Sequence, residues 1–300
     1  MGVDRIVLGC GNFGGIGSDL SLVGRGESEA QAFELMDAAW ARGVRRFDTA
    51  SSYGGGHSEK TIGAWVRARQ PVGLGLTSKV FHPVHVGDDG GLAPARVRRV
   101  VRESRERLGV DRIDVYLVHE PDPATPLAAT LSALEELVRN EVVGAIGVSN
   151  VDAAFLAEAV RLAPIAVVQN EYSLLARASE DDVLPLCTEH GIEFQAFSPL
   201  AGGWLTGKYA RGAAYPQGSR MTLRPDPYAE FVRPEVFDAI EELARRGESA
   251  TLALAWILAN RDVGAVVVGP RRLAHLETTW AALALPVDRD ELTELFTWSR

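Results

Sequence analysis

The chain has 300 residues, of which 46% are hydrophobic and 24% charged, the usage of a globular protein with a substantial core. Its 40 acidic side chains outnumber its 31 basic ones, and the net charge of −9 argues against nucleic acid or an anionic membrane as the main partner. Two cysteines are too few for a disulfide framework or a four-cysteine metal site. A signal region and a membrane-length apolar run are both missing, so we expect a cytoplasmic protein.

From the N-terminus onward, short apolar runs alternate with longer amphipathic ones. The runs that predict buried strands cover residues 6–10, 45–48, 74–79, 114–119, 143–149, 166–171, 193–197 and 265–268. Helical patterns cover residues 28–42, 58–69, 93–108, 126–140, 152–161, 183–190, 234–246, 251–260, 271–283 and 288–298. Eight strands, each followed by helix, predict an α/β fold: a (β/α)8 TIM barrel forming a single domain over residues 1–300.

Two features lie outside the repeating unit. Residues 199–233, after the seventh strand, contain several glycines and prolines and predict a long lid loop, and residues 288–298 predict a C-terminal helix. Some helix ends carry the expected capping residues. Ser28 and Gln31 have the spacing of a capping box, and Gly191 follows a helix as a C′ glycine does.

The C-terminal ends of barrel strands converge on one face, so polar residues there form one site. The second strand ends in Asp48, and Tyr53 follows in a glycine-rich loop. The third strand ends in Lys79, and the fourth ends in His119. An ammonium beside a phenol favours the phenolate and lowers its pKa, a carboxylate keeps the ammonium charged, and an imidazole orients a carbonyl oxygen. These four residues predict a catalytic set that delivers a proton to a carbonyl oxygen.

The remaining rim groups suit a nicotinamide cofactor. No flavin or metal signature accompanies the catalytic set, so hydride from a nicotinamide is the expected attacking group. We expect Ser149, Asn150 and Gln169 to hold the carboxamide of such a cofactor and Phe197 to stack on its ring. We expect Lys208, Arg220 and Arg271 to meet its phosphates. The helix start after Gly269 would add to the phosphate contacts.

A glycine-rich phrase follows the first strand. Gly9-Cys10-Gly11-Asn12-Phe13-Gly14 matches the glycine spacing of a Rossmann fingerprint, but that motif requires a helix to open at the third glycine, and here a loop follows. We therefore expect Cys10 and Gly11 to bring the backbone close to the cofactor or substrate.

Aromatic side chains in the rim loops predict the walls of a substrate pocket. Phe13, Phe81 and Trp204 are the candidates, with His119 facing the substrate. We expect the partner to be a small carbonyl compound and the protein to be a monomer or a small homo-oligomer.

Several longer phrases occur in order along the chain: Phe47-Asp48-Thr49-Ala50, Ser78-Lys79, Asp114-Val115-Tyr116-Leu117-Val118-His119, Ile146-Gly147-Val148-Ser149-Asn150, Gln169-Asn170-Glu171-Tyr172-Ser173 and Phe197-Ser198-Pro199-Leu200-Ala201-Gly202-Gly203. Together they resemble the aldo-keto reductase superfamily. Two further phrases resemble its bacterial and potassium-channel β-subunit branch: Leu205-Thr206-Gly207-Lys208-Tyr209 and Gly218-Ser219-Arg220.

The resemblance implies a (β/α)8 barrel that reduces carbonyl compounds with NADPH. It implies Tyr53 as general acid, Lys79 and Asp48 as the pair that tunes it, and His119 as the residue that orients substrate. It also implies cofactor contacts from Ser149, Asn150, Gln169, Phe197, Ser198, Pro199, Leu200, Ala201, Gly202, Lys208, Arg220, Gly269, Arg271 and His275.

The chain departs from the family pattern after the eighth strand. His275, Thr278 and Thr279 stand where the family carries Gln and then Glu-Asn, which puts the adenine contacts in doubt. Arg271 keeps a partner for a 2′-phosphate, so we expect NADPH (NADP+) rather than NADH.

Three other functions fit parts of the pattern. Lys79 could be the Schiff-base nucleophile of a lyase, although Asp48 would hold its ammonium charged. The chain could be a non-catalytic, NADPH-binding regulatory subunit, which the complete catalytic set disfavours. Histidines 82 and 85 could suggest a metal-dependent hydrolase, but they lie in a proline-containing loop and we expect no metal site. Asp48 and Lys79 alone could also be a structural ion pair.

Overall fold

The computed structural model describes residues 2–298 and contains a closed parallel barrel. Neighbouring strands pair in sequence order around the ring. The strands are β1 (Ile6–Gly9), β2 (Arg46–Asp48), β3 (Gly75–Val80), β4 (Ile113–Val118), β5 (Val143–Ser149), β6 (Ile165–Glu171), β7 (Glu193–Phe197) and β8 (Ala265–Val268). Each predicted strand is present with its ends shifted by at most one residue, so the predicted (β/α)8 fold is confirmed.

Closure depends on the pairing of the first and last strands. Ile6 lies opposite Val266 and Leu8 opposite Val268, while Leu8 also pairs with Phe47 of β2. All pairs are parallel, so the carboxyl end of every strand opens on the same face.

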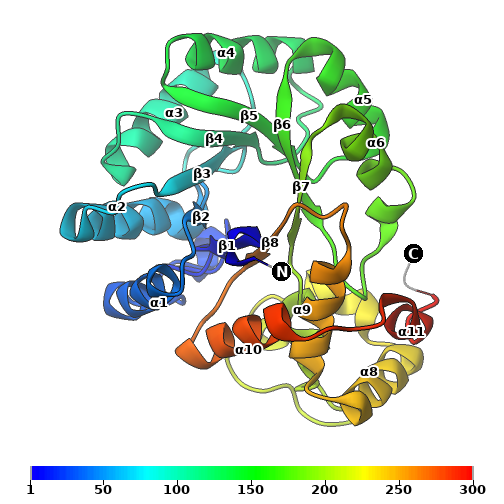
Figure 1. Cartoon of the computed structure of the whole chain (residues 1–300). Helices are drawn as coiled ribbons and strands as arrows, with labels where there is room; N and C mark the ends of the chain where they lie inside the picture. The colour runs from blue at the N-terminus through cyan, green and yellow to red at the C-terminus, as the bar shows by residue number, and fades with distance from the viewer. Residues whose placement is uncertain (1, 299–300) are drawn as a thin grey trace.

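Helices surround the barrel, as Figure 1 shows for α1 to α6 on one side and α8 to α11 on the other. The helices are α1 (Glu29–Ala41), α2 (His57–Arg69), α3 (Pro94–Leu108), α4 (Leu127–Arg139), α5 (Ala153–Leu162), α6 (Val183–His190), α7 (Arg220–Leu223), α8 (Pro234–Arg246), α9 (Ser249–Ala259), α10 (Leu273–Ala284) and α11 (Arg289–Glu294). The 3-10 segments are η1 (Val3–Arg5), η2 (Leu20–Leu22), η3 (Tyr53–Gly56), η4 (Ala178–Glu180), η5 (Ala201–Thr206) and η6 (Asp226–Phe231).

The predicted helix ends rest on local chemistry. At the start of α1, Ser28 Oγ accepts from the Gln31 backbone N–H and Gln31 Oε1 accepts from the Ser28 N–H, which completes the capping box. Gly191 ends α6 with φ 65°, a left-handed conformation that favours glycine.

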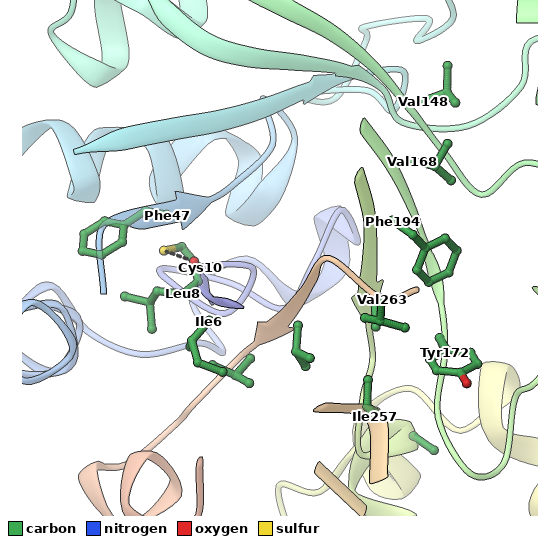
Figure 2. Close-up of a cluster of buried hydrophobic side chains, with 14 of the residues drawn as sticks. Ile6, Leu8, Cys10, Phe47, Val148, Val168, Tyr172, Phe194, Ile257 and Val263 are labelled. Carbon is green, nitrogen blue, oxygen red and sulfur yellow. Dashed lines mark hydrogen bonds between the residues drawn. The ribbon is translucent and has the colours of Figure 1, made fainter. Parts of the chain in front are cut away.

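Two apolar cores lie on the two faces of the sheet. The larger fills the space between strands and helices; Figure 2 shows part of it, from Leu8 and Phe47 to Phe194 and Tyr172. The smaller lies inside the barrel and consists of Val7, Ala265 and Val267, with Phe197 packed against it. The interior above this small core is polar, and that is where the site begins.

The segment between β7 and α8 is more ordered than a loop. It contains η5, the one-turn helix α7, and η6. Tyr228 of η6 lies against Gly202 of η5, where an added Cβ would approach the tyrosine ring to 2.4 Å. The lid is therefore a folded strap over the carboxyl ends of the strands.

No helix within residues 2–298 is long and apolar enough to cross a membrane.

Candidate active site

Asp48, Tyr53, Lys79 and His119 meet at the carboxyl ends of β2, β3 and β4. Lys79 is 1% exposed, and its Nζ lies 2.5 Å from Asp48 Oδ1 and 3.4 Å from Tyr53 Oη. Tyr53 Oη lies 3.4 Å from His119 Nε2. A third contact, from Lys79 Nζ to the backbone oxygen of Thr49 at 2.8 Å, fixes the ammonium in place. The structure thus brings the four predicted catalytic residues together.

Tyr53 is held by the glycine turn that follows it. Gly54, Gly55 and Gly56 have φ values of 57°, 64° and 84°, which residues other than glycine rarely adopt. An added Cβ on Gly54 would lie 2.9 Å from the backbone oxygen of Phe13. The turn therefore packs directly on the loop after β1, and this packing sets the direction of the phenol.

The charge states of the site follow from burial. Desolvation raises the pKa of Tyr53 above its usual 10, although the Lys79 charge acts in the opposite direction. Lys79 thus lowers the tyrosine pKa as expected, but in this buried site desolvation is the larger effect and the net shift of the pKa is upward. Tyr53 is consequently a neutral phenol at pH 7.

Lys79 and His119 differ in charge: Lys79 is a cation and His119 is neutral. Burial opposes the Lys79 ammonium, but Asp48 and Tyr53 outweigh it and raise the pKa of Lys79. Burial, with help from the nearby Lys79 charge and from His82, lowers the pKa of His119 well below 6.5. The site therefore pairs a fixed cation with a neutral imidazole, on either side of the phenol.

A line of hydrogen bonds runs from this site down the barrel interior. Gln169 Nε2 donates to Asp48 Oδ2 at 2.9 Å and to Gln195 Oε1 at 3.1 Å. Gln195 Nε2 donates to Glu193 Oε2 at 3.0 Å, and Arg46 Nη1 pairs with Glu193 Oε1 at 2.6 Å. Gln195, Glu193 and Arg46 were not predicted, because no local motif links β7, which carries the first two, to β2, which carries Arg46.

His82 and Glu120 form a second pair at the edge of the site. Their Nε2 and Oε1 atoms lie 3.0 Å apart, and the His82 ring meets the His119 ring edge-on with centroids 4.8 Å apart. Phe81 meets the His82 ring edge-on, with centroids 5.1 Å apart, and is half-buried. His82 thus contacts both Phe81 and His119, and its pairing with Glu120 has no local sequence motif that would predict it.

The predicted carboxamide contacts lie at the ends of β5 and β6. Gln169 is 2% exposed, and because its amide N–H groups go to Asp48 and Gln195, its carbonyl oxygen remains to accept from an amide. Asn150 Nδ2 donates to the His119 backbone oxygen at 2.9 Å, and to Ser149 Oγ at 3.2 Å. Acceptors from three residues thus fit an amide donor group such as the carboxamide of a nicotinamide.

Backbone strain gathers at the same rim. Asn150, Ser198 and Ala201 have φ values of 57°, 54° and 46°, which cost about 1–3 kcal/mol each and cluster at functional sites. The strained turn continues from Phe197, which packs on the interior core, through Pro199 and Leu200 to Gly202.

Cations collect around the loops after β7 and β8. Partial burial, together with the charges of Arg220 and Arg271, lowers the pKa of Lys208. Burial, together with the charges of Arg272, Lys208 and Arg271, lowers the pKa of His275. Arg220 Nη2 donates to Asn12 Oδ1 at 2.5 Å, and the Arg271 backbone N–H donates to His275 Nδ1 at 3.2 Å. Such a group of like charges fits the phosphates of a dinucleotide.

Three further residues after β8, Gly269, Thr278 and Thr279, differ in their contacts. Gly269 lies beside Asn12, with an added Cβ 3.8 Å from Asn12 Nδ2. Thr278 and Thr279 use their hydroxyls on the carbonyl oxygens of Ala274 and His275 in their own helix. These two threonines are therefore engaged within α10.

Three predicted contact residues lie in the core instead of the pocket. Trp204 is fully buried and packs against Tyr209, Phe231 and Phe237, and Phe13 is 1% exposed within the main core. The Cys10 thiol is also fully buried, and burial raises its pKa well above 9. The expectation that Phe13 and Trp204 line the pocket is wrong, because the strap and the β1 loop need these aromatic rings for their own packing.

Gly11, in the β1 loop, lies against Tyr53. An added Cβ at Gly11 would lie 3.4 Å from the Tyr53 ring, so the loop approaches the phenol closely here. The Cys10 backbone N–H and oxygen are already bonded, to the Asp48 oxygen and the Ser58 hydroxyl. Within residues 2–298, no group of three or more His, Cys, Asp or Glu side chains is arranged to hold a metal ion.

Comparisons with known proteins agree with this geometry. The model of the aldo/keto reductase family matches residues 5–297. The chain is 35% identical to the uncharacterized oxidoreductase YrpG of Bacillus subtilis over 98% of this chain and 91% of that one, and 33% identical to an NADH-specific methylglyoxal reductase of Escherichia coli, over 84% and 82%. It is 29% identical to a probable voltage-gated potassium channel subunit beta of Arabidopsis thaliana, over 88% and 87%.

Among solved structures, a glycerol dehydrogenase from Gluconobacter oxydans superimposes with a TM-score of 0.82 at 26% identity, covering 98% of this chain and 90% of that one. The resemblance read from the ordered motifs is thereby confirmed, and so is the barrel. The family consists of nicotinamide-dependent oxidoreductases that act on small carbonyl compounds. The chain belongs to the aldo/keto reductase family.

Proposed function

We propose that this protein reduces an aldehyde or ketone to an alcohol with NADPH, and that Tyr53 is the general acid. The observation that carries the proposal is the contact set around the phenol: Lys79 Nζ and His119 Nε2 each lie 3.4 Å from Tyr53 Oη. A neutral phenol between a cation and a neutral imidazole is suited to giving a proton to an oxygen that gains negative charge.

The chemistry divides between the cofactor and the chain. A bound reduced nicotinamide supplies the hydride for the carbonyl carbon. Tyr53 donates its proton to the carbonyl oxygen, and the phenolate that remains is stabilised by Lys79, which Asp48 keeps protonated. His119, in the neutral tautomer that carries its proton on Nε2, donates a hydrogen bond to the same oxygen and so orients the substrate. The phenol is then reprotonated from water.

The cofactor residues follow from where the predicted side chains lie. Ser149, Asn150 and Gln169 offer oxygen acceptors to the carboxamide, and Phe197 offers a ring at the top of the interior core. The backbone of Gly11 and of the strained turn, Ser198, Pro199, Leu200, Ala201 and Gly202, lines the path between ring and phosphates. Lys208, Arg220, Gly269, Arg271 and His275 form the phosphate end.

Substrate contacts involve fewer residues than the sequence predicted. His119 and Phe81 remain, and His82 with Glu120 joins them at the pocket edge. The short distance between the His82–Glu120 pair and His119 favours a polar, small carbonyl compound over a long apolar one.

A Schiff-base lyase is the weaker candidate, because the ion pair with Asp48 raises the pKa of Lys79 and keeps the amine from acting as a nucleophile. The two functions are separated by one comparison. NADPH oxidation is followed with a panel of small aldehydes and ketones, and borohydride trapping of Lys79 is tested with the same compounds. The proposal predicts oxidation of NADPH and no trapped lysine; trapping without NADPH oxidation would overturn it. Tight NADPH binding with no turnover across the panel would instead favour a regulatory subunit.

A further inference from the structure

Glu27 is a buried carboxylate that the proposed reaction does not use. It lies just before α1, is 4% exposed, and its backbone is tied to the β1 loop by bonds from Glu27 N to Asn12 O (2.8 Å) and from Gly14 N to Glu27 O (2.9 Å). Its Oε1 accepts from Arg271 Nε at 2.6 Å. The side chain therefore crosses from the β1 loop to the loop after β8, into the cationic cluster.

Arg271 is the centre of that cluster and is only partly satisfied by Glu27. Its Nη1 donates to the Gly218 backbone oxygen at 3.1 Å, and its side chain is 36% exposed. Beside burial, the charge of Arg271 contributes to lowering the pKa values of both Lys208 and Arg220, which places all three cations close together. Glu27 thus pairs with Nε and the Gly218 oxygen with Nη1, while Nη2 has no hydrogen-bond partner among the described residues and can donate to an anion.

The second oxygen of Glu27 is unpaired. Oε2 is buried and receives no hydrogen bond from any residue between 2 and 298. A buried acceptor without a donor is destabilising, and a ligand hydroxyl would satisfy it. A phosphate would not, because two anions at short distance repel one another. Burial also raises the pKa of Glu27, although the hydrogen bond and charge of Arg271 act in the opposite direction.

We propose that Glu27 sets the choice between NADPH and NADH. Its carboxylate neutralises one edge of Arg271 and repels a 2′-phosphate, and its free Oε2 accepts a hydrogen bond from the 2′-hydroxyl of NADH. The inference rests on the proposed function, in which Arg271 faces the 2′ position of the adenosine. It predicts that the natural chain binds both coenzymes and that Glu27 limits its preference for NADPH.

The test measures dissociation constants of NADPH and NADH by protein-fluorescence titration at one ionic strength, without substrate. Glu27→Gln keeps an oxygen for Arg271 Nε and removes the charge. It should raise the ratio Kd(NADH)/Kd(NADPH) about tenfold, the size expected for removing one partly screened charge near another. The matched control is Glu29→Gln, the same change at an exposed position two residues later, which should leave the ratio within about twofold.

Two outcomes would overturn the inference: an unchanged ratio in Glu27→Gln, or an equal change in both dissociation constants. If Glu27→Gln does not fold, Arg271→Gln probes the same pair from its more exposed side. It should weaken NADPH binding about tenfold and NADH binding much less, and equal weakening of both would overturn the inference. A protein that bound neither coenzyme would contradict the proposed function itself, whereas intact turnover with an unchanged ratio would contradict only the role of Glu27.

Discussion

The ammonium nitrogen of Lys79 lies 3.4 Å from the phenolic oxygen of Tyr53, inside a barrel where Lys79 is 1% exposed. A cation in that position stabilises the phenolate left after proton donation, and Asp48 at 2.5 Å prevents the amine from losing its proton. The distance between these two atoms therefore connects the fold to the proposed chemistry.

Removing the Lys79 charge should affect catalysis and leave coenzyme affinity nearly unchanged. Lys79→Met withdraws the cation that stabilises the Tyr53 phenolate, so kcat should fall by about 10²-fold or more. Lys208→Met, which changes a cation of the phosphate end, should instead raise the Kd for NADPH with a much smaller effect on kcat. Steady-state kinetics give kcat and fluorescence titration gives the Kd for NADPH of both variants. If the two variants changed kcat and Kd by the same amounts, this prediction would be contradicted.

Gln195 should matter for stability although it touches no substrate. Gln195→Leu removes the acceptor of Gln169 and the donor to Glu193 in the barrel interior, and leaves buried polar atoms unpaired. We expect a loss of about 1–3 kcal/mol in the free energy of unfolding, measured by urea denaturation. Gln217→Leu is the surface control, because Gln217 is exposed. Equal free energies of unfolding for the two variants would show that the interior line of bonds contributes nothing.

The strap should depend on the missing side chain of Gly202. Gly202→Ala adds a Cβ that would approach the Tyr228 ring to 2.4 Å at φ 62°, so η5 and η6 must separate. Coenzyme dissociation, followed by stopped-flow fluorescence, should be faster by about tenfold. Gly212→Ala has a similar φ of 70°, and no described residue lies within 4 Å of its added Cβ. It should cost only local strain, and a dissociation rate that rose equally in both variants would contradict a closed strap.

Asp88 should give the protein a specific acid sensitivity. Burial opposes its carboxylate, but hydrogen bonds from Arg96 and the Val84 N–H outweigh it and hold the pKa of Asp88 below 3.8. Since the folded pKa is below the unfolded one, the stabilisation is fully present above about pH 4 and is lost as pH falls through the folded pKa. Asp88→Asn should lower the free energy of unfolding at pH 7 by on the order of 3 kcal/mol, because the buried Arg96 loses its carboxylate and keeps only the backbone oxygens of His82 and Gly91 as partners.

The control for Asp88 is Glu106→Gln, which breaks an exposed pair with Arg102 on the surface of α3. Exposed pairs contribute about 0–1 kcal/mol, so this variant should remain close to the natural protein at every pH. A difference between Asp88→Asn and the natural chain that stayed constant from pH 7 down to pH 2 would contradict the assigned pKa direction.

The fold was predictable because its signal is local and repeated. Each strand is a short apolar run, such as that of β8, and each is followed by an amphipathic helix with recognisable ends. Asp48, Lys79 and His119 were predictable for the same reason: a barrel places every strand end on one face, so position along the chain predicts position in the site.

The remainder depends on contacts between distant segments, which no local pattern encodes. Glu27 and Arg271 are 244 positions apart, and Gln169 meets Asp48 from 121 positions away. For Trp204, a local pattern was present but misleading. Its place in a rim loop predicted a pocket wall, but burial of a large aromatic ring under the strap is the stronger effect.

Single-turnover kinetics test directly whether Tyr53 donates the proton. Enzyme loaded with NADPH is mixed with the most active carbonyl compound of the panel, and nicotinamide oxidation is followed by absorbance for the natural chain and for Tyr53→Phe. Tyr53→Phe should bind NADPH with an unchanged Kd but oxidise it slower by about 10²-fold or more. Oxidation of NADPH by Tyr53→Phe at the natural rate would show that Tyr53 is not the general acid.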